Sequence, residues 1–186
     1  MEVGKLNNKL PLILDSTVLL NFIKIGKKDI LVKLYGKSMV IPQQVKLEVI
    51  IDPDVGPIVE EMINDKLLEE YIIDYNSESS EISDYCYLNK RFGAGESACI
   101  SIAKNRKCTI VTDDMRAAYK YCKKNSVSLK GSLGIIYEAY EKKIISFDEG
   151  QAILDDMIKI RKYTSPVSSF DDIVNWFDKG IGKELF

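Results

Sequence analysis

The sequence contains no histidine among its 186 residues. This absence excludes a Ser-His-Asp triad, a Cys-His pair, a histidine general base and any zinc site that needs histidine ligands. If the chain is an enzyme, its chemistry must depend on carboxylates, lysines, hydroxyls, thiols or a bound metal ion.

Long apolar stretches are also missing. No run approaches the roughly 20 apolar residues that span a bilayer. The opening MEVGKLNNKL carries an acidic residue and lacks the apolar core of a secretory signal. A hydrophobic content of 46% and a charged content of 29% are typical of globular domains, which excludes a disordered or fibrous chain. We therefore expect a soluble cytoplasmic protein with no membrane association.

The cysteine pattern shows no C-x-x-C pair. Zinc sites and disulfide frameworks are normally marked by such close spacing, so neither is indicated here. We instead predict buried thiols at all four positions, Cys86, Cys99, Cys108 and Cys122.

Charge is distributed unevenly, although the net charge is only -2. Residues 50–84 hold eleven acidic residues and one lysine, whereas residues 85–143 hold twelve basic and five acidic residues. The basic stretch either forms a surface that binds phosphate groups or consists of ordinary solvated helix faces. Composition leaves both interpretations open.

Strand-like and helix-like segments alternate along most of the chain. Alternation of this kind, with short loops, favours an α/β domain with a mainly parallel sheet. We predict this domain over residues 1–133 and, over residues 134–186, a helical extension that packs on the same domain. The expected strands are apolar or β-branched segments bounded by turn residues, at residues 11–15, 38–41, 67–75, 108–112 and 127–131.

Five carboxylates occupy places that a parallel sheet can bring together. Asp15 ends the first predicted strand, and Asp113 and Asp114 directly follow the fourth. Glu48 lies within an apolar helix pattern, and Glu96 lies in the first turn of a predicted helix. Open parallel sheets bind their ligands beyond the carboxyl ends of the strands, so these acids are candidates for one site.

Each acid also has an ordinary explanation, as a helix cap, a partner of a helix dipole or a solvent-facing side chain. Considered together, they favour a different interpretation. Carboxylates that converge in one cleft repel one another strongly unless a cation lies among them. Because oxygen ligands alone suit hard divalent ions, the sequence indicates a site for Mg2+ or Mn2+.

Four segments resemble the PIN-domain nucleases in their order and approximate spacing. They are LILDSTVLLNFIKIG, VIPQQVKLEV, GAGESACISIA and TIVTDDMRAAYKYCKKN. The segment GSLGIIYEAYEKKIIS and the later helices resemble a bacterial and archaeal subgroup close to the VapC-type toxin ribonucleases. The likeness covers nearly all of the chain.

This resemblance implies a Rossmann-like α/β/α sandwich and a metal-dependent endoribonuclease. By their positions in the family's motifs, the implied catalytic acids are Asp15, Glu48, Glu96 and Asp114. The implied metal ligands are Asp15, Glu96 and Asp114, with Asp113 as a further carboxylate. The family also implies RNA as a partner, a homodimer and, for a toxin, an antitoxin protein.

Four further residues are candidates for substrate binding. Arg91 and Arg116 lie near the acids in sequence, so they are candidate phosphate ligands. Ser16 and Thr112 each adjoin a predicted acid, and their hydroxyls either bind carboxylate or phosphate groups or cap helices. The basic stretch from Lys104 to Lys130 is a candidate surface for the RNA backbone.

Two alternatives to this function remain open. A PIN-like protein can bind RNA or a protein partner without cutting it, and a nuclease of this fold can act on DNA. A phosphatase of the haloacid dehalogenase type needs a second aspartate two residues after the first. Thr17 stands at that position after Asp15, so the sequence excludes this class.

Overall fold

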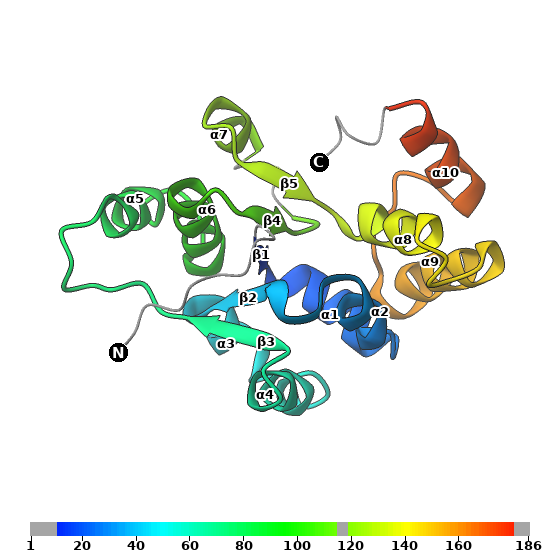
Figure 1. Cartoon of the computed structure of the whole chain (residues 1–186), viewed down its shortest axis with the longest axis horizontal. Coiled ribbons are helices and arrows are strands. Elements are labelled where there is room, and N and C mark those ends of the chain that lie inside the picture. Colours follow the sequence, from blue (N-terminus) through cyan, green and yellow to red (C-terminus); the bar gives the residue numbers. More distant parts are fainter. Residues whose placement is uncertain (1–10, 115–118, 181–186) are drawn as a thin grey trace.

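A five-stranded, all-parallel sheet forms the centre of the fold (Figure 1). The computed structural model describes residues 11–114 and 119–180. The strands are β1 (Leu12–Leu14), β2 (Met39–Pro42), β3 (Leu68–Tyr71), β4 (Thr109–Val111) and β5 (Ser128–Lys130). They lie in the order β3-β2-β1-β4-β5, so the predicted α/β class with a mainly parallel sheet is confirmed.

Helices cover both faces of this sheet, which gives the expected α/β/α arrangement (Figure 1). Between the strands lie α1 (Ser16–Lys24), α2 (Lys28–Tyr35), the short 3-10 turn η1 (Gly36–Ser38), α3 (Gln43–Val49), α4 (Gly56–Asn64), α5 (Ser80–Leu88), α6 (Ala94–Arg106) and α7 (Tyr119–Lys124). The chain continues after β5 with α8 (Ser132–Glu141), α9 (Phe147–Arg161) and α10 (Phe170–Asp178).

The direction in which strands are added reverses next to β1. Strands β2 and β3 lie on one side of β1, and strands β4 and β5, which come later in the chain, lie on its other side. In register, Leu12 lies opposite Met39 of β2 and Thr109 of β4. The crevice of an open α/β sheet forms where the strand order reverses. The carboxyl ends of β1 and β4 are therefore the expected place for a site.

One hydrophobic core runs through the described part of the chain, from Ile13 to Ile173. Helix α1 shows why the sequence folds locally as it does. Its buried Val18, Leu19 and Phe22 fall on one face at helical spacing and pack towards the core. The strands are too short to be stable alone, so their burial between helices supplies most of their stability.

The C-terminal helices belong to the same core. Helix α9 begins with a capping box in which Ser146 and Glu149 bind each other's backbone N–H, and it packs against α1 and α8. Phe170 at the start of α10 is fully buried, and its ring lies against Gly150 of α9. The predicted boundary after residue 133 falls inside α8, where Leu133 is itself part of the core.

Some sequence predictions differ from the structure. Cys86 is exposed, although a buried thiol was predicted there, because it lies on the outer face of α5. The strand predicted at 67–75 is shorter, since β3 ends at Tyr71 and the following Ile72 is 55% exposed. In the described residues, no helix is long and apolar enough to cross a membrane.

Candidate functional site

Asp15 and Asp114 meet at the carboxyl ends of β1 and β4, where the strand order reverses. Asp15 directly follows β1 and is the N-cap residue of α1. Its backbone N–H donates to the carbonyl oxygen of Val111 at 3.0 Å, which joins the ends of the two strands. Asp113 and Asp114 follow β4 after Thr112, so the topology brings residues almost 100 positions apart into one place.

Two threonine hydroxyls fix the Asp15 carboxylate. Thr17 Oγ1 donates to Asp15 Oδ2 at 2.8 Å, and Thr112 Oγ1 donates to the same oxygen at 2.7 Å. Within residues 11–114 and 119–180, no hydrogen bond ends on Asp15 Oδ1. Asp15 Oδ1 is not one of the buried polar atoms that lack a partner, so it must be accessible to solvent. It is therefore the oxygen that is open to a ligand.

The same two hydroxyls also hold the turn after β4. Thr17 Oγ1 accepts the backbone N–H of Asp113 at 3.1 Å, and Thr112 Oγ1 accepts that of Asp114 at 3.2 Å. Thr112 is only 1% exposed, so its hydroxyl lies beneath the carboxylates and not at the surface. Its contacts are those of a residue that positions the acids.

Glu48 reaches the site from α3. Its carboxylate lies near Ser16 and near the backbone of Gly95, the second residue of α6, and both of these neighbours oppose the rise of its pKa. A Cβ atom at Gly95 would lie 2.6 Å from Glu48 Oε1, which is far closer than van der Waals contact. Glycine at this position therefore lets Glu48 lie against the start of α6. Partial burial and then the negative charge of Asp15 raise the pKa of Glu48.

Glu96 lies in the first turn of α6 and is partly buried. Its carboxylate lies near the backbone of Gly93, the N-cap residue, which acts to lower its pKa, and a negative charge in the first turn suits the helix dipole. The same side chain also lies in the field of the other acids. Burial, then the charge of Asp15, then that of Asp114 raise the pKa of Glu96.

Asp15, Glu48, Glu96 and Asp114 thus lie close enough for their negative charges to affect one another. We call these four residues the acid cluster. Among the described residues, no ion pair involves any of these four carboxylates. A group of oxygen donors with uncompensated charge fits a hard divalent cation.

The side chains of the acid cluster are not arranged around a common ion. Within residues 11–114 and 119–180, no three metal-ligating side chains lie close enough together to hold one as they stand. Glu48 and Asp114 are the most exposed members of the acid cluster, so their side chains have the most room to rotate. Shared coordination by the acid cluster therefore requires these two carboxylates to turn towards Asp15.

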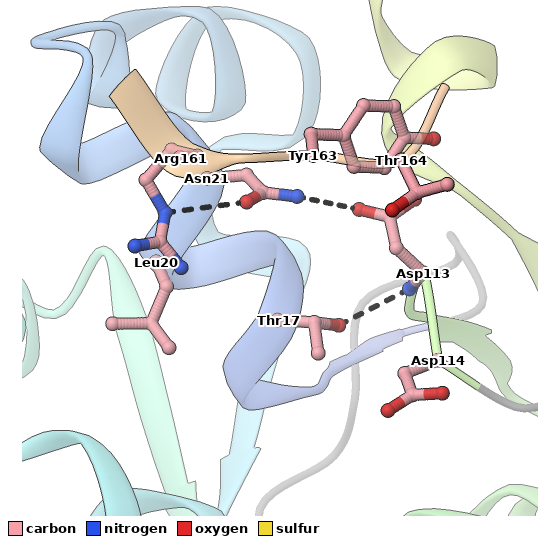
Figure 2. A pocket seen from close by; sticks show the side chains of 8 residues that line it. All are labelled: Thr17, Leu20, Asn21, Asp113, Asp114, Arg161, Tyr163 and Thr164. Atoms are coloured by element: carbon pink, nitrogen blue, oxygen red, sulfur yellow. Dashed lines mark hydrogen bonds between the residues drawn. The ribbon is translucent and has the colours of Figure 1, made fainter. Parts of the chain in front are cut away.

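Asp113 differs from its neighbour Asp114. Its Oδ2 accepts from Asn21 Nδ2 at 2.8 Å and from Ser132 Oγ at 2.5 Å, and its Oδ1 accepts from the Ser132 backbone N–H at 2.8 Å. Burial, then the negative charge of Asp113, raise the pKa of Tyr163, whose side chain lies close to this carboxylate. The Asp113 side chain points towards Asn21 and Tyr163, while Asp114 points the other way (Figure 2). Burial raises the pKa of Asp113, and protein groups occupy both of its oxygens.

A cleft of about 340 Å³ adjoins the acid cluster (Figure 2). One wall comes from α1, another from the end of β4, and the third from the chain that leaves α9. The sequence did not predict the third wall. The one signal for it is Asn21, a polar residue in the apolar pattern of α1, because a buried amide needs hydrogen-bond partners from another segment. The lining residues are Thr17, Leu20, Asn21, Asp113, Asp114, Arg161, Tyr163 and Thr164.

The predicted substrate-binding residues lie in different environments. Ser16 is near Glu48, as described above. The Arg91 guanidinium lies over the Tyr87 ring, 4.7 Å from its centroid. Arg116 lies outside the described residues. In the described part of the basic stretch, three side chains form ion pairs with acids of neighbouring helices: Lys104 with Asp84, Arg106 with Glu81 and Lys130 with Glu138.

Comparison with known families places the chain beside a described family. A family model, DUF3368, which is described as a PIN domain, matches residues 11–170. This range contains β1 to β5, the acid cluster and the cleft, and it ends at the first residue of α10. No curated protein matches the chain.

The electrostatic coupling within the acid cluster leads to a prediction. Replacing Asp15 with Asn removes one negative charge beside both glutamates, so the pKa values of Glu48 and Glu96 should fall towards their ordinary values. Carboxyl-detected NMR titration measures both. Asp54→Asn is the control, because Asp54 is exposed, lies between α3 and α4, and is not among the charges that shift the pKa of Glu48 or Glu96. Unchanged pKa values in the Asp15 variant would contradict the close approach of these carboxylates.

Proposed function

Because the chain belongs to the PIN-domain family, whose members are generally nucleases, we propose that it is a metal-dependent endoribonuclease. The acid cluster carries this proposal. Four carboxylates from four different segments approach one another where the strand order reverses, without an ion pair among the described residues to neutralise them. Repulsion among these carboxylates destabilises the folded protein, and the binding of a cation would explain why they are nevertheless brought together.

The metal of this proposal is Mg2+ or Mn2+, held by Asp15, Asp114 and Glu96, with Glu48 as a further ligand or as the residue that orients water. A divalent ion bound there supplies an activated water and neutralises charge on the leaving oxygen of a phosphodiester. Chemistry of this kind needs no histidine. We assign Asp113 to the support of the cleft, because its oxygens already accept hydrogen bonds from Asn21 and Ser132.

The other residues of the site position the acids. Thr17 and Thr112 hold Asp15 Oδ2, which directs Oδ1 to the ligand, and they fix the backbone that carries Asp114. Gly95 admits Glu48 to the start of α6. Partners of this kind, behind the ligands, typically change metal affinity or activity by about 10- to 100-fold.

Removing the charge of Asp15 or of Asp114 should strongly reduce cleavage without unfolding the protein. Asp15→Asn and Asp114→Asn should each lower the rate of Mg2+-dependent cleavage of single-stranded RNA by roughly a hundredfold or more. EDTA should stop the wild-type reaction, and Mg2+ should raise the melting temperature of the wild type more than that of either variant. Asp54→Asn serves as the matched control and should behave as the wild type, because Asp54 is exposed and is not among the charges that shift the pKa of Glu48 or Glu96.

Two results would overturn parts of this proposal. Cleavage that survives both substitutions would remove the acid cluster from the mechanism. A wild-type protein that is inert on RNA, and whose melting temperature does not respond to Mg2+ or Mn2+, would favour a PIN-like binding module. Cleavage of the matching DNA but not the RNA would keep the nuclease and change its substrate.

Gly95 allows a test in which activity and stability change independently. Gly95→Ala places a methyl group 2.6 Å from the observed position of Glu48 Oε1, so the Glu48 carboxylate must shift away from the start of α6. Cleavage should fall by roughly ten- to a hundredfold. Stability should not fall in parallel, because alanine favours the helix over glycine by up to about 1 kcal/mol.

Gly93→Ala is the matched control for this test. Gly93 precedes the same helix, has an ordinary negative φ, and a Cβ there would meet no atom within 4 Å. Equal rates for the two variants, measured with RNA cleavage and thermal melting together, would show that Glu48 is not needed at its observed position.

We also propose that this nuclease is the toxin of a toxin-antitoxin pair. The support is the resemblance of GSLGIIYEAYEKKIIS and the later helices to the VapC-type subgroup. Expression of the wild-type chain should then arrest bacterial growth, the Asp114→Asn variant should not, and the product of a small adjacent gene should relieve the arrest. Growth curves measure all three. Arrest that no neighbouring gene product relieves would instead indicate a nuclease that acts alone.

A further inference from the structure

We infer that Arg161 binds a backbone phosphate of the nucleic acid, next to the phosphate that lies at the acid cluster. The cleft beside α1 would then hold the nucleotide that joins the two phosphates. This inference rests on the proposed nuclease function and adds a substrate-binding site to it. It is carried by the position of Arg161, by its lack of an acidic partner and by the contacts that hold it in place.

The cleft and the acid cluster are continuous. Thr17 and Asp114 line the cleft, and Thr17 also donates to the Asp15 carboxylate. Arg161 lines the same cleft from the end of α9 (Figure 2). A nucleic acid strand with one phosphate at the acid cluster therefore passes directly into a cleft that contains a guanidinium group.

Arg161 is not neutralised by the protein. Other cations of the described chain form ion pairs, for example Lys104 with Asp84 and Lys130 with Glu138. In residues 11–114 and 119–180, by contrast, no ion pair includes Arg161. Its one hydrogen bond there is from Nε to Asn21 Oδ1, at 3.4 Å. The terminal amino groups of the guanidinium are therefore available for phosphate oxygens.

A chain of hydrogen bonds orients this guanidinium. Asn21 Nδ2 donates to Asp113 Oδ2 at 2.8 Å, which turns Asn21 Oδ1 towards Arg161 (Figure 2). Lys162 ends α9 in a left-handed conformation, with φ of 55°. The chain then turns and brings Tyr163 close to Asp113; burial, then the charge of Asp113, raise the pKa of Tyr163. Contacts on both sides of the turn thus hold Arg161 in place before any ligand binds, which lowers the entropic cost of binding.

The charge of the cleft is consistent with a phosphate ligand. Asp113 lies in the cleft wall, but Asn21 and Ser132 already occupy its oxygens. Asp114 belongs to the acid cluster, whose charge a bound cation would offset. Arg161 is then the charged group of the cleft that remains without a partner among the described residues, and its planar guanidinium suits phosphate oxygens.

Binding of a labelled single-stranded RNA to the Asp114→Asn protein tests this inference without cleavage. In that background, Arg161→Ala should raise Kd by roughly tenfold and should reduce the slope of log K against log salt by about one. Arg161→Lys should keep the salt slope, because it keeps the charge. In the otherwise wild-type protein, Arg161→Ala should raise KM far more than it lowers kcat.

Lys159→Ala is the matched control. Lys159 lies two residues earlier on α9, its side chain is 73% exposed, and it faces Asp155 across one turn. It should change neither Kd nor the salt slope. An Arg161→Ala variant with unchanged Kd and slope but a lower melting temperature would overturn the inference, because the Arg161–Asn21 contact would then serve the fold alone.

The outcomes also separate this inference from the proposed function. If the wild type cleaves RNA and Arg161→Ala changes neither Kd nor KM, the nuclease stands and the phosphate site is wrong. If the wild type does not cleave, but binding depends on Arg161 as described, the phosphate site stands and the nuclease proposal fails. A DNA strand of the same sequence that binds equally well supports a contact with phosphate alone. If neither strand binds, the inference is overturned.

Discussion

The pair of hydrogen bonds from Thr17 and Thr112 to Asp15 Oδ2 is the interaction on which the site depends. The two threonines come from α1 and from the end of β4, and both also accept a backbone N–H of the turn after β4. One carboxylate oxygen thus joins two strands, and the other is left for a ligand. Without these hydroxyls, the Asp15 carboxylate would lose its two hydrogen-bond donors among the described residues, and the backbone N–H groups of Asp113 and Asp114 would lose their acceptors.

The electrostatics of the site oppose folding. The pKa values of Glu48 and Glu96 are raised, so the folded protein holds their protons more tightly than the unfolded chain does. Their contribution to the free energy of unfolding is therefore favourable at low pH, and it declines as the pH rises through their ordinary range towards the raised values. A bound cation acts in the opposite sense, since it stabilises the charged carboxylates. The core, including the C-terminal helices, must supply the stability that the acid cluster removes.

Sequence reasoning was sufficient for the sheet and for its family, because the relevant signals are local. A β-branched strand followed by acids, as at Thr109–Val111, and an apolar helix that begins after glycine, as at Ala94, can be recognised from short segments. Parallel topology then decides which strand ends meet. The exposure of Cys86 was missed, because the orientation of α5 depends on tertiary packing that its weak periodicity does not specify.

The distinction between Asp113 and Asp114 shows what the sequence could not provide. The two adjacent acids follow the same strand, and only their partners differ. Asp113 accepts hydrogen bonds from Asn21 and Ser132 and lies close to Tyr163, and these residues belong to three other segments of the chain, whereas Asp114 is exposed at the acid cluster.

The cleft likewise depends on contacts between segments that are far apart in the sequence. Its third wall reaches the site only because α9 packs against α1 and the chain turns at Lys162. Arg161 is about 150 residues from Asp15, and no motif connects them. Asp113 therefore links the two halves of the site: its backbone is fixed by the same hydroxyl that holds Asp15, and its carboxylate holds the asparagine that orients Arg161.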